Sequence, residues 1–205
     1  MNLVIGSGDA NTLLMGKDTK GFQDLIRKFV AIDKPYYNAL ASPIDQLRSG
    51  FILEEAYFKQ LPDDFYSQIK RASKEIDVCI STLDFAILGK DEVIDFDELK
   101  TLSLTDFLEI IEPLRFAEQS EYLPIIQKTF KKYYIQVQFQ LFCTDLNSAN
   151  LVFLAVETYN DQENYAREIT ERDYIKFRVF RDEQVISQLK ERANFFQGIK
   201  NYLNS

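Results

Sequence analysis

Residues 77–101 read DVCISTLDFAILGKDEVIDFDELKT, and this stretch decides the fold that we expect. Two runs rich in apolar and β-branched residues, Asp77–Asp84 and Glu92–Thr101, lie on either side of a Gly-Lys-Asp turn within Leu88–Asp91. Side chains that alternate between apolar and polar types, bounded by turn residues, predict β-strands. Because the connection is short, we expect the two strands to form an antiparallel hairpin.

The hairpin places acidic and basic side chains on one face. Residues two apart in a strand point the same way, so Glu98 and Lys100 share a face and Leu99 points to the other. If Asp84 pairs near Glu98, two carboxylates and one ammonium group meet. Such oxygens suit a hard divalent ion, and the lysine can orient or deprotonate a water molecule or neutralise developing charge. An ordinary solvated Glu–Lys pair gives the same pattern, so the hairpin alone leaves both interpretations open.

The remaining segments predict helices around further strands. Before the hairpin we expect a short extended piece and then helices, at Leu3–Asp9, Ala10–Met15, Phe22–Val30, Ser42–Gln60 and Phe65–Lys74. After it we expect a helix at Leu104–Leu114, a turn at Asn147–Asn150, strands at Leu151–Thr158 and Tyr174–Arg181, and a helix at Glu183–Leu203. The residues of Tyr122–Cys143 leave helix and strand open. This order predicts an α/β (α+β) fold with a mixed central β-sheet flanked by helices, in one domain of residues 1–205.

Composition excludes several kinds of chemistry. The 205 residues contain no histidine, which excludes Ser-His-Asp and Cys-His catalysis and imidazole zinc sites. Cys79 and Cys143 lie in apolar stretches, which predicts buried free thiols in a reducing compartment. No signal peptide is recognised and no apolar run approaches the roughly 20 residues of a membrane helix, so we expect a cytoplasmic protein without a membrane partner. The net charge of -8 weighs against nucleic-acid binding, but an acidic exterior is compatible with a local basic groove.

Five motifs follow one another along the chain, at Ile5–Ala10 (IGSGDA), Arg48–Glu54 (RSGFILE), Ser81–Asp84 (STLD), Asp97–Lys100 (DELK) and Tyr133–Thr144 (YYIQVQFQLFCT). In this order they resemble the PD-(D/E)XK nucleases, and within them the lambda exonuclease / YqaJ-type viral recombinase group. The resemblance spans roughly residues 3–181 and implies a restriction-endonuclease-like core. It also implies that Tyr122–Cys143 is helical.

The resemblance implies roles for particular residues. It implies a Mg²⁺ ion, or Mn²⁺ in its place, held by Asp84, Glu98, the Leu99 carbonyl and Glu54, the last either as a ligand of a second ion or through water. Lys100 then positions or activates water, and Gln136 contacts the terminal phosphate or the region of Lys100. The residues implied in binding DNA or phosphate are Ser7, Arg48, Thr82, Gln136 and Gln138.

The sequence departs from the group's pattern in three places. Gly8 stands where the group usually has serine, so Ser7 is the candidate for the phosphate contact there, and Leu83 replaces a proline. The connection before Gln136 is long, which suggests an insertion around Glu109–Glu121. Two basic clusters are equally compatible with phosphate binding and with a solvated helix face, namely Lys17, Lys20, Arg27 and Lys28, and Lys128, Lys131 and Lys132.

The resemblance also implies a function. It predicts a Mg²⁺-dependent 5′-to-3′ exonuclease that digests double-stranded DNA ends and leaves a 3′ single strand for a strand-annealing protein in recombination. A homotrimeric ring and a phage origin, with action in the host cytoplasm, are implied as well. The alternatives are a PD-(D/E)XK endonuclease or RecB-like repair nuclease and, from another class, a non-catalytic DNA-binding or assembly module.

Overall fold

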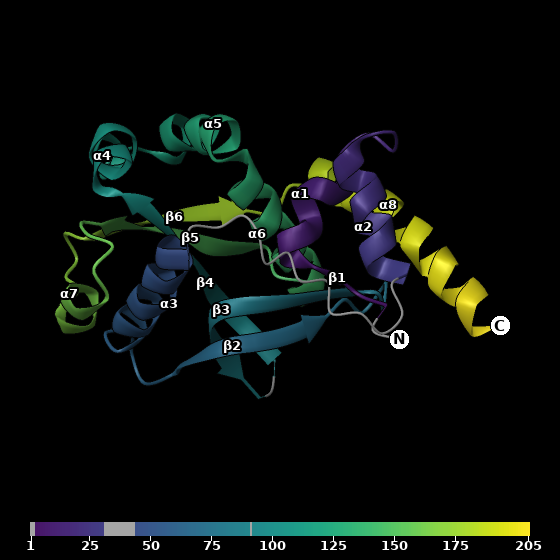
Figure 1. Ribbon diagram of the computed structural model, residues 1–205, viewed down its shortest axis with the longest axis horizontal. Helices are drawn as coiled ribbons and strands as arrows, with labels where there is room; N and C mark the ends of the chain where they lie inside the picture. The colour runs from purple at the N-terminus through teal and green to yellow at the C-terminus, as the bar shows by residue number, and fades with distance from the viewer. Residues whose placement is uncertain (1–2, 31–43, 91) are drawn as a thin grey trace.

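A six-stranded mixed β-sheet forms the centre of the protein. The computed structural model describes residues 3–30, 44–90 and 92–205 (Figure 1). The strands are β1 (Ile5–Gly6), β2 (Phe65–Ala72), β3 (Cys79–Gly89), β4 (Glu92–Ser103), β5 (Ser148–Val156) and β6 (Tyr174–Phe180). Their order is β1-β3-β4-β5-β6, and β2 also pairs with β3. A mixed sheet flanked by helices confirms the predicted fold class.

The predicted hairpin is present as β3 and β4. Antiparallel pairing runs from Gly89 opposite Glu92 to Phe85 opposite Asp97. Beyond that pair β4 continues in parallel with β5, from Asp97 to Ser103. Asp84 lies inside β3 and not at the end of a strand as predicted, because β3 extends to Gly89. The carboxylate residues Asp84 and Glu98 therefore directly follow the last registered pair of the hairpin.

The helix predicted at Phe65–Lys74 is wrong, because Phe65–Ala72 forms strand β2. This strand pairs antiparallel with β3, with Phe65 opposite Ile87. Phe65 and Ile69 are four residues apart, which imitates a helical period, while the side chains between them face solvent. Gln68, between them, has a left-handed backbone with φ 54° and breaks the regular alternation of the strand.

Helices cover both faces of the sheet. One face packs on α1 (Ala10–Leu13), α2 (Lys20–Val30), α5 (Gln119–Thr129), α6 (Lys131–Thr144) and α8 (Glu183–Asn204), and the other on α3 (Ile44–Phe58), with α7 (Asp161–Ala166) beside α3 (Figure 1). Strand β5 has apolar side chains on both faces of the sheet, so helices must bury both faces. Its Leu151 and Phe153 belong to the first core and its Val152 and Leu154 to the second. Alternate residues are thus buried on opposite sides.

Other predicted elements are present with altered bounds. Leu104–Leu114 is helical but irregular, made of α4 (Leu104–Asp106), the π-helical η2 (Phe107–Ile111) and the 3₁₀ turn η3 (Glu112–Leu114). Tyr122–Cys143 is helical, as the resemblance implied, but Phe130 separates α5 from α6. The predicted turn at Asn147–Asn150 is too long, because β5 begins at Ser148. The expected helix start at Ser42–Pro43 lies outside the described residues.

Two further expectations concern the cysteines and membranes. Cys79 and Cys143 are both free and buried, as predicted. Among the residues that the structure describes, no helix is long and apolar enough to cross a membrane. The short 3₁₀ turn η1 (Ser7–Asp9) follows β1 and packs against β3 and α6.

Candidate active site

Glu98 is the centre of the candidate site. Its side chain, on β4, has no exposed surface. Lys100 lies two residues further along the same strand face and donates a hydrogen bond to Glu98 Oε1. A buried carboxylate is tolerated only where charge and hydrogen bonds compensate for lost water. The strand period predicted from the sequence thus brings the two charged groups into contact.

Helix α6 supplies two more donors to the same carboxylate. Gln136 Nε2 donates to Glu98 Oε1, and Gln140 Nε2 donates to Glu98 Oε2 and to the carbonyl of Thr82, the latter at 3.1 Å. Gln136 was predicted at the site, whereas Gln140 was not. Its signal in the sequence is its position four residues after Gln136, which puts both amides on one helix face. Both oxygens of Glu98 are therefore held in place.

Asp84 lies beside this pair, where β3 and β4 part. Its Oδ2 accepts a hydrogen bond from the backbone amide of Leu99 at 2.9 Å. Burial, followed by the negative charges of Glu98 and Glu54, raises the pKa of Asp84 well above its usual value, although Lys100 and the Leu99 amide act in the opposite direction. Asp84 and Glu98 are thus close enough to repel each other strongly.

Glu54 approaches the pair from helix α3. Burial raises the pKa of Glu54 above its usual value. The charge of Lys100 lowers this pKa and the charge of Glu98 raises it, so Glu54 interacts electrostatically with both groups on β4. Burial alone would lower the pKa of Lys100, but the carboxylates of Glu98, Asp84 and Glu54 raise it above its usual value. Lys100 is therefore held as an ammonium ion among three carboxyl groups.

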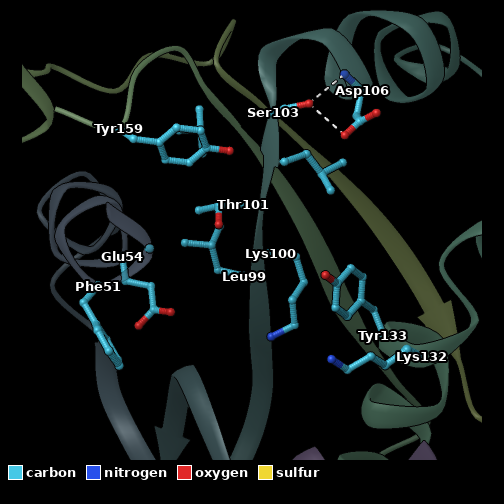
Figure 2. Close-up of a pocket in the computed structure, with 13 residues that line it drawn as sticks. Phe51, Glu54, Leu99, Lys100, Thr101, Ser103, Asp106, Lys132, Tyr133 and Tyr159 are labelled. Atoms are coloured by element: carbon cyan, nitrogen blue, oxygen red, sulfur yellow. Dashed lines mark hydrogen bonds between the residues drawn. The ribbon is translucent and has the colours of Figure 1, made fainter. Parts of the chain in front are cut away.

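Of these groups, Glu54 and Lys100 line an open cleft of about 610 Å³ together with Leu99. Asp84, Glu98, Gln136 and Gln140 are not among its lining residues. Figure 2 shows Glu54 and Phe51 from α3 on one side of Lys100, and Tyr133 and Lys132 from α6 on the other. The Lys100 ammonium lies 5.6 Å from the centroid of the Tyr133 ring. The cleft thus combines two members of the charge cluster, Glu54 and Lys100, with aromatic side chains and a second cation, Lys132, at its wall.

The donor set fits a hard divalent ion. Asp84, Glu98 and the Leu99 carbonyl offer oxygens, and a bound cation would favour the ionised forms of Asp84 and Glu54, whose pKa values are raised in its absence. Gln140 Oε1, beside Glu98, is buried without a hydrogen-bond partner in the structure. Within the described ranges, no three Asp, Glu, Cys or His side chains form a ready-made metal-binding group. Mg²⁺ needs only one or two carboxylates, because water and substrate phosphate complete its shell.

Other residues implied in DNA binding do not line the cleft. Gln138 is buried and turned away, since its Nε2 donates to the carbonyl of Phe180 at 2.9 Å and its Oε1 accepts from the amide of Asp182 at 2.8 Å. Ser7 is buried in η1, and Arg48 is exposed on α3. Neither is among the residues that line the cleft. Thr82 reaches the site through its carbonyl oxygen.

The two basic clusters differ in position. Lys132 lines the cleft. In the early cluster, Lys28 pairs with Asp9 at 2.7 Å and Arg27 pairs with Asp24 at 2.9 Å, so these cations already have carboxylate partners. Of the later cluster, Lys132 at the start of α6 is the residue that extends the site, whereas Lys128 lies in α5 and Lys131 lines another pocket.

Known structures share this architecture, although no family model matches the sequence and no curated protein is similar to it. An alkaline exonuclease from Laribacter hongkongensis matches with a TM-score of 0.60 and 12% identity, over 98% of this chain and 91% of that chain. The same enzyme in complex with dAMP gives a TM-score of 0.59 and 12% identity, over 98% and 92%. A phage-related exonuclease from Haemophilus somnus 129PT gives 0.58 and 14%, over 98% and 96%. The chain therefore has the fold of the alkaline and phage-related exonucleases, as its resemblance to the PD-(D/E)XK nucleases predicted.

Proposed function

We propose that this protein is a metal-dependent DNA exonuclease whose active centre is built on Glu98. The observation that carries the proposal is the buried Glu98 carboxylate, which lies beside Asp84 and is held by Gln136, Gln140 and Lys100. Lys100 connects this carboxylate to the open cleft, which it lines together with Glu54. A fold shared over nearly the whole chain with proteins described as exonucleases supports the same conclusion.

The roles of the residues follow from their positions. Asp84, Glu98 and the Leu99 carbonyl would hold Mg²⁺, or Mn²⁺ in its place. When bound, the ion would activate water and offset the charge that develops on the phosphate. Glu54, across the cleft, would act as a ligand of a second ion or through a bound water.

Lys100 has a more specific role. The carboxylates of Glu98, Asp84 and Glu54 raise the pKa of Lys100, which favours its ammonium form and a role as a donor. It would orient the attacking water or stabilise the negative charge of the transition state, while Gln136 contributes a neutral donor toward the phosphate.

The finer parts of the proposal rest on the resemblance of the five motifs. They are digestion of the strand with the 5′ end, a 3′ single strand left for a strand-annealing protein in recombination, a homotrimeric ring and a phage origin with action in the host cytoplasm. The binding of dAMP by the enzyme from Laribacter hongkongensis is in keeping with a nucleotide product in a site of this kind.

Linear and closed circular duplex DNA test the proposal. With Mg²⁺, we expect linear duplex labelled separately on each strand to lose the strand with the 5′ end progressively, and covalently closed circles to stay intact. Cutting of closed circles would indicate an endonuclease, and loss of the strand with the 3′ end would reverse the polarity. Binding to DNA without digestion under any divalent ion would favour the non-catalytic module.

A further inference from the structure

Asp97, the neighbour of Glu98, is a second carboxylate of β4 with no exposed surface. Its Oδ1 accepts a hydrogen bond from Asn150 Nδ2 at 2.7 Å. Its Oδ2 accepts from the Tyr57 hydroxyl at 3.0 Å and from Lys176 Nζ at 2.7 Å. The three donors come from β5, α3 and β6, so Asp97 links three elements to the strand that carries Glu98 and Lys100. Such a buried network fixes the groups that share it.

Tyr57 is held firmly at its end of this network. Only 1% of its surface is exposed. Its ring lies 5.4 Å from the Phe85 ring and 5.1 Å from the Tyr174 ring, centroid to centroid, and Lys176 Nζ lies 5.7 Å from its centroid. The hydrogen bond of the Tyr57 hydroxyl to Asp97 therefore fixes the position of this end of α3 relative to β4.

Glu54 stands between two contacts of α3 with β4. Gly50, Glu54 and Tyr57 follow a spacing of four and three residues, which places them on one helix face. At one end, a Cβ atom built on Gly50 would lie 3.9 Å from Thr101 Oγ1. At the other end, Tyr57 bonds Asp97.

The helix segment between Gly50 and Tyr57 and the strand segment between Asp97 and Thr101 have similar lengths. Residues 50–57 of the helix span about 10 Å, and residues 97–101 of the strand about 13 Å. Helix α3 thus packs on the Leu99 face of β4, and Glu54 faces Lys100 across the cleft that both line (Figure 2).

We infer that Tyr57 and Asp97 are positioning residues: their hydrogen bond sets the place of Glu54 relative to the Glu98–Lys100 pair, and so the affinity of the site for a divalent ion. This inference rests on the proposed function. Neither side chain lines the cleft. Groups that orient metal-binding residues typically change metal affinity or activity 10- to 100-fold when they are removed.

The neighbouring ion pair of Asp95 and Arg178 provides a matched control. Asp95 lies two residues before Asp97 on the same face of β4 and pairs with Arg178 at 2.8 Å. Arg178 also contacts Asn150 and Ser148, whereas neither Asp95 nor Arg178 has a recorded hydrogen bond to α3 within the described residues. Asp95→Asn therefore removes a partly exposed ion pair that reaches Tyr57 only indirectly, through Arg178, Asn150 and Asp97.

The test compares Tyr57→Phe, Asp97→Asn and Asp95→Asn in the full chain. Tyr57→Phe keeps the ring and removes only the hydroxyl, so it remains informative if Asp97→Asn fails to fold. We would measure Mn²⁺ binding by titration calorimetry, thermal unfolding, and the Mg²⁺ concentration that gives half-maximal DNA digestion. Tyr57→Phe is expected to weaken Mn²⁺ binding and raise the Mg²⁺ requirement about tenfold. Asp95→Asn is expected to change both less than about twofold, because its ion pair is partly exposed and does not contact α3 directly.

Two results would overturn the inference: Mn²⁺ binding by Tyr57→Phe that equals the wild type, or equal weakening by Asp95→Asn. The proposed function fails separately. If the wild type digests no DNA while Tyr57→Phe still weakens Mn²⁺ binding and Asp95→Asn does not, the positioning role stands and the nuclease activity is rejected.

Discussion

At the scale of single residues, the site depends on how Glu98 is kept charged inside the protein. Lys100 supplies the opposite charge, and two glutamine amides complete the hydrogen bonds of both carboxylate oxygens. Gln136 was predicted from the sequence, but Gln140 was missed and Gln138 was placed at the site instead. The physical reason is the helical phase, because residues four apart share a face and residues two apart lie on nearly opposite sides.

Replacement of Gln140 by leucine tests the role of the amides. Gln140→Leu leaves Glu98 Oε2 without its side-chain donor, so we expect metal binding and DNA digestion to fall about 10- to 100-fold in a folded protein. Gln138→Leu is the matched control, because it removes a buried amide from the same helix that bonds only backbone groups of Phe180 and Asp182. It should lower stability and leave metal affinity unchanged. Equal loss of metal affinity in both variants would contradict this role.

At the scale of elements, α3 and β4 form the site by their close approach. Hydrophobic periodicity and the sequence motifs predicted both elements, together with Glu54 on α3 and Glu98 and Lys100 on β4. The sequence did not predict β2, because the strand's partly buried apolar residues Phe65 and Ile69 are four apart and do not alternate, and its pairing with β3 is a non-local contact. The contact between Tyr57 and Asp97 could not be predicted from the sequence either, because these residues are 40 apart in the chain and only the fold brings them together.

Gly50→Ala tests the spacing between α3 and β4. The new methyl group would meet Thr101 Oγ1 at 3.9 Å, which is an ordinary contact, so the helix should gain about 0.5–1 kcal/mol from the replacement of an interior glycine. Gly198→Ala in α8 is the control, because a Cβ there meets nothing within 4 Å. Chemical denaturation should show similar gains for both variants. A loss of stability confined to Gly50→Ala would mean that α3 lies too close to β4 to accept a methyl group at residue 50.

At the scale of the whole molecule, one sheet with a core on each face buries most of the apolar side chains of its strands, while Tyr66, Ile94 and Phe180 stay exposed. The sequence predicted the hairpin, β5, β6 and the terminal helix α8 with small errors in their bounds. The strand order could not be predicted, because β1 and β2 both pair with β3 and their partners are distant along the chain. Sheet topology of this kind is determined by packing across the molecule and not by local pattern.

The two buried thiols report on the integrity of this packing. Burial raises the pKa of Cys79 to about 12, and burial also raises the pKa of Cys143. Native protein should therefore react very slowly with a thiol reagent at pH 8, and both cysteines should react after denaturation. Rapid modification of the native protein would contradict the burial of these residues.

The same thiols make stability depend on alkaline pH. An unfolded cysteine ionises near pH 8.5, whereas folded Cys79 holds its proton to about 12, so the unfolded state binds fewer protons in this window. The free energy of unfolding should therefore fall as the pH rises from about 8.5 toward 12. Denaturation of Cys79→Ala across the same range should show a shallower fall, and an unchanged slope would assign the effect to other groups.

The most direct test of the central claim is the digestion of linear duplex DNA by the wild type and by Lys100→Met. Methionine keeps an unbranched side chain of similar length and removes the charge that Glu98 and the transition state require. We predict release of nucleotides by the wild type with Mg²⁺, none with a chelator, and a loss of at least about 100-fold in Lys100→Met. Digestion by Lys100→Met at the rate of the wild type, or digestion that persists in the chelator, would contradict a metal-dependent centre built on Glu98 and Lys100.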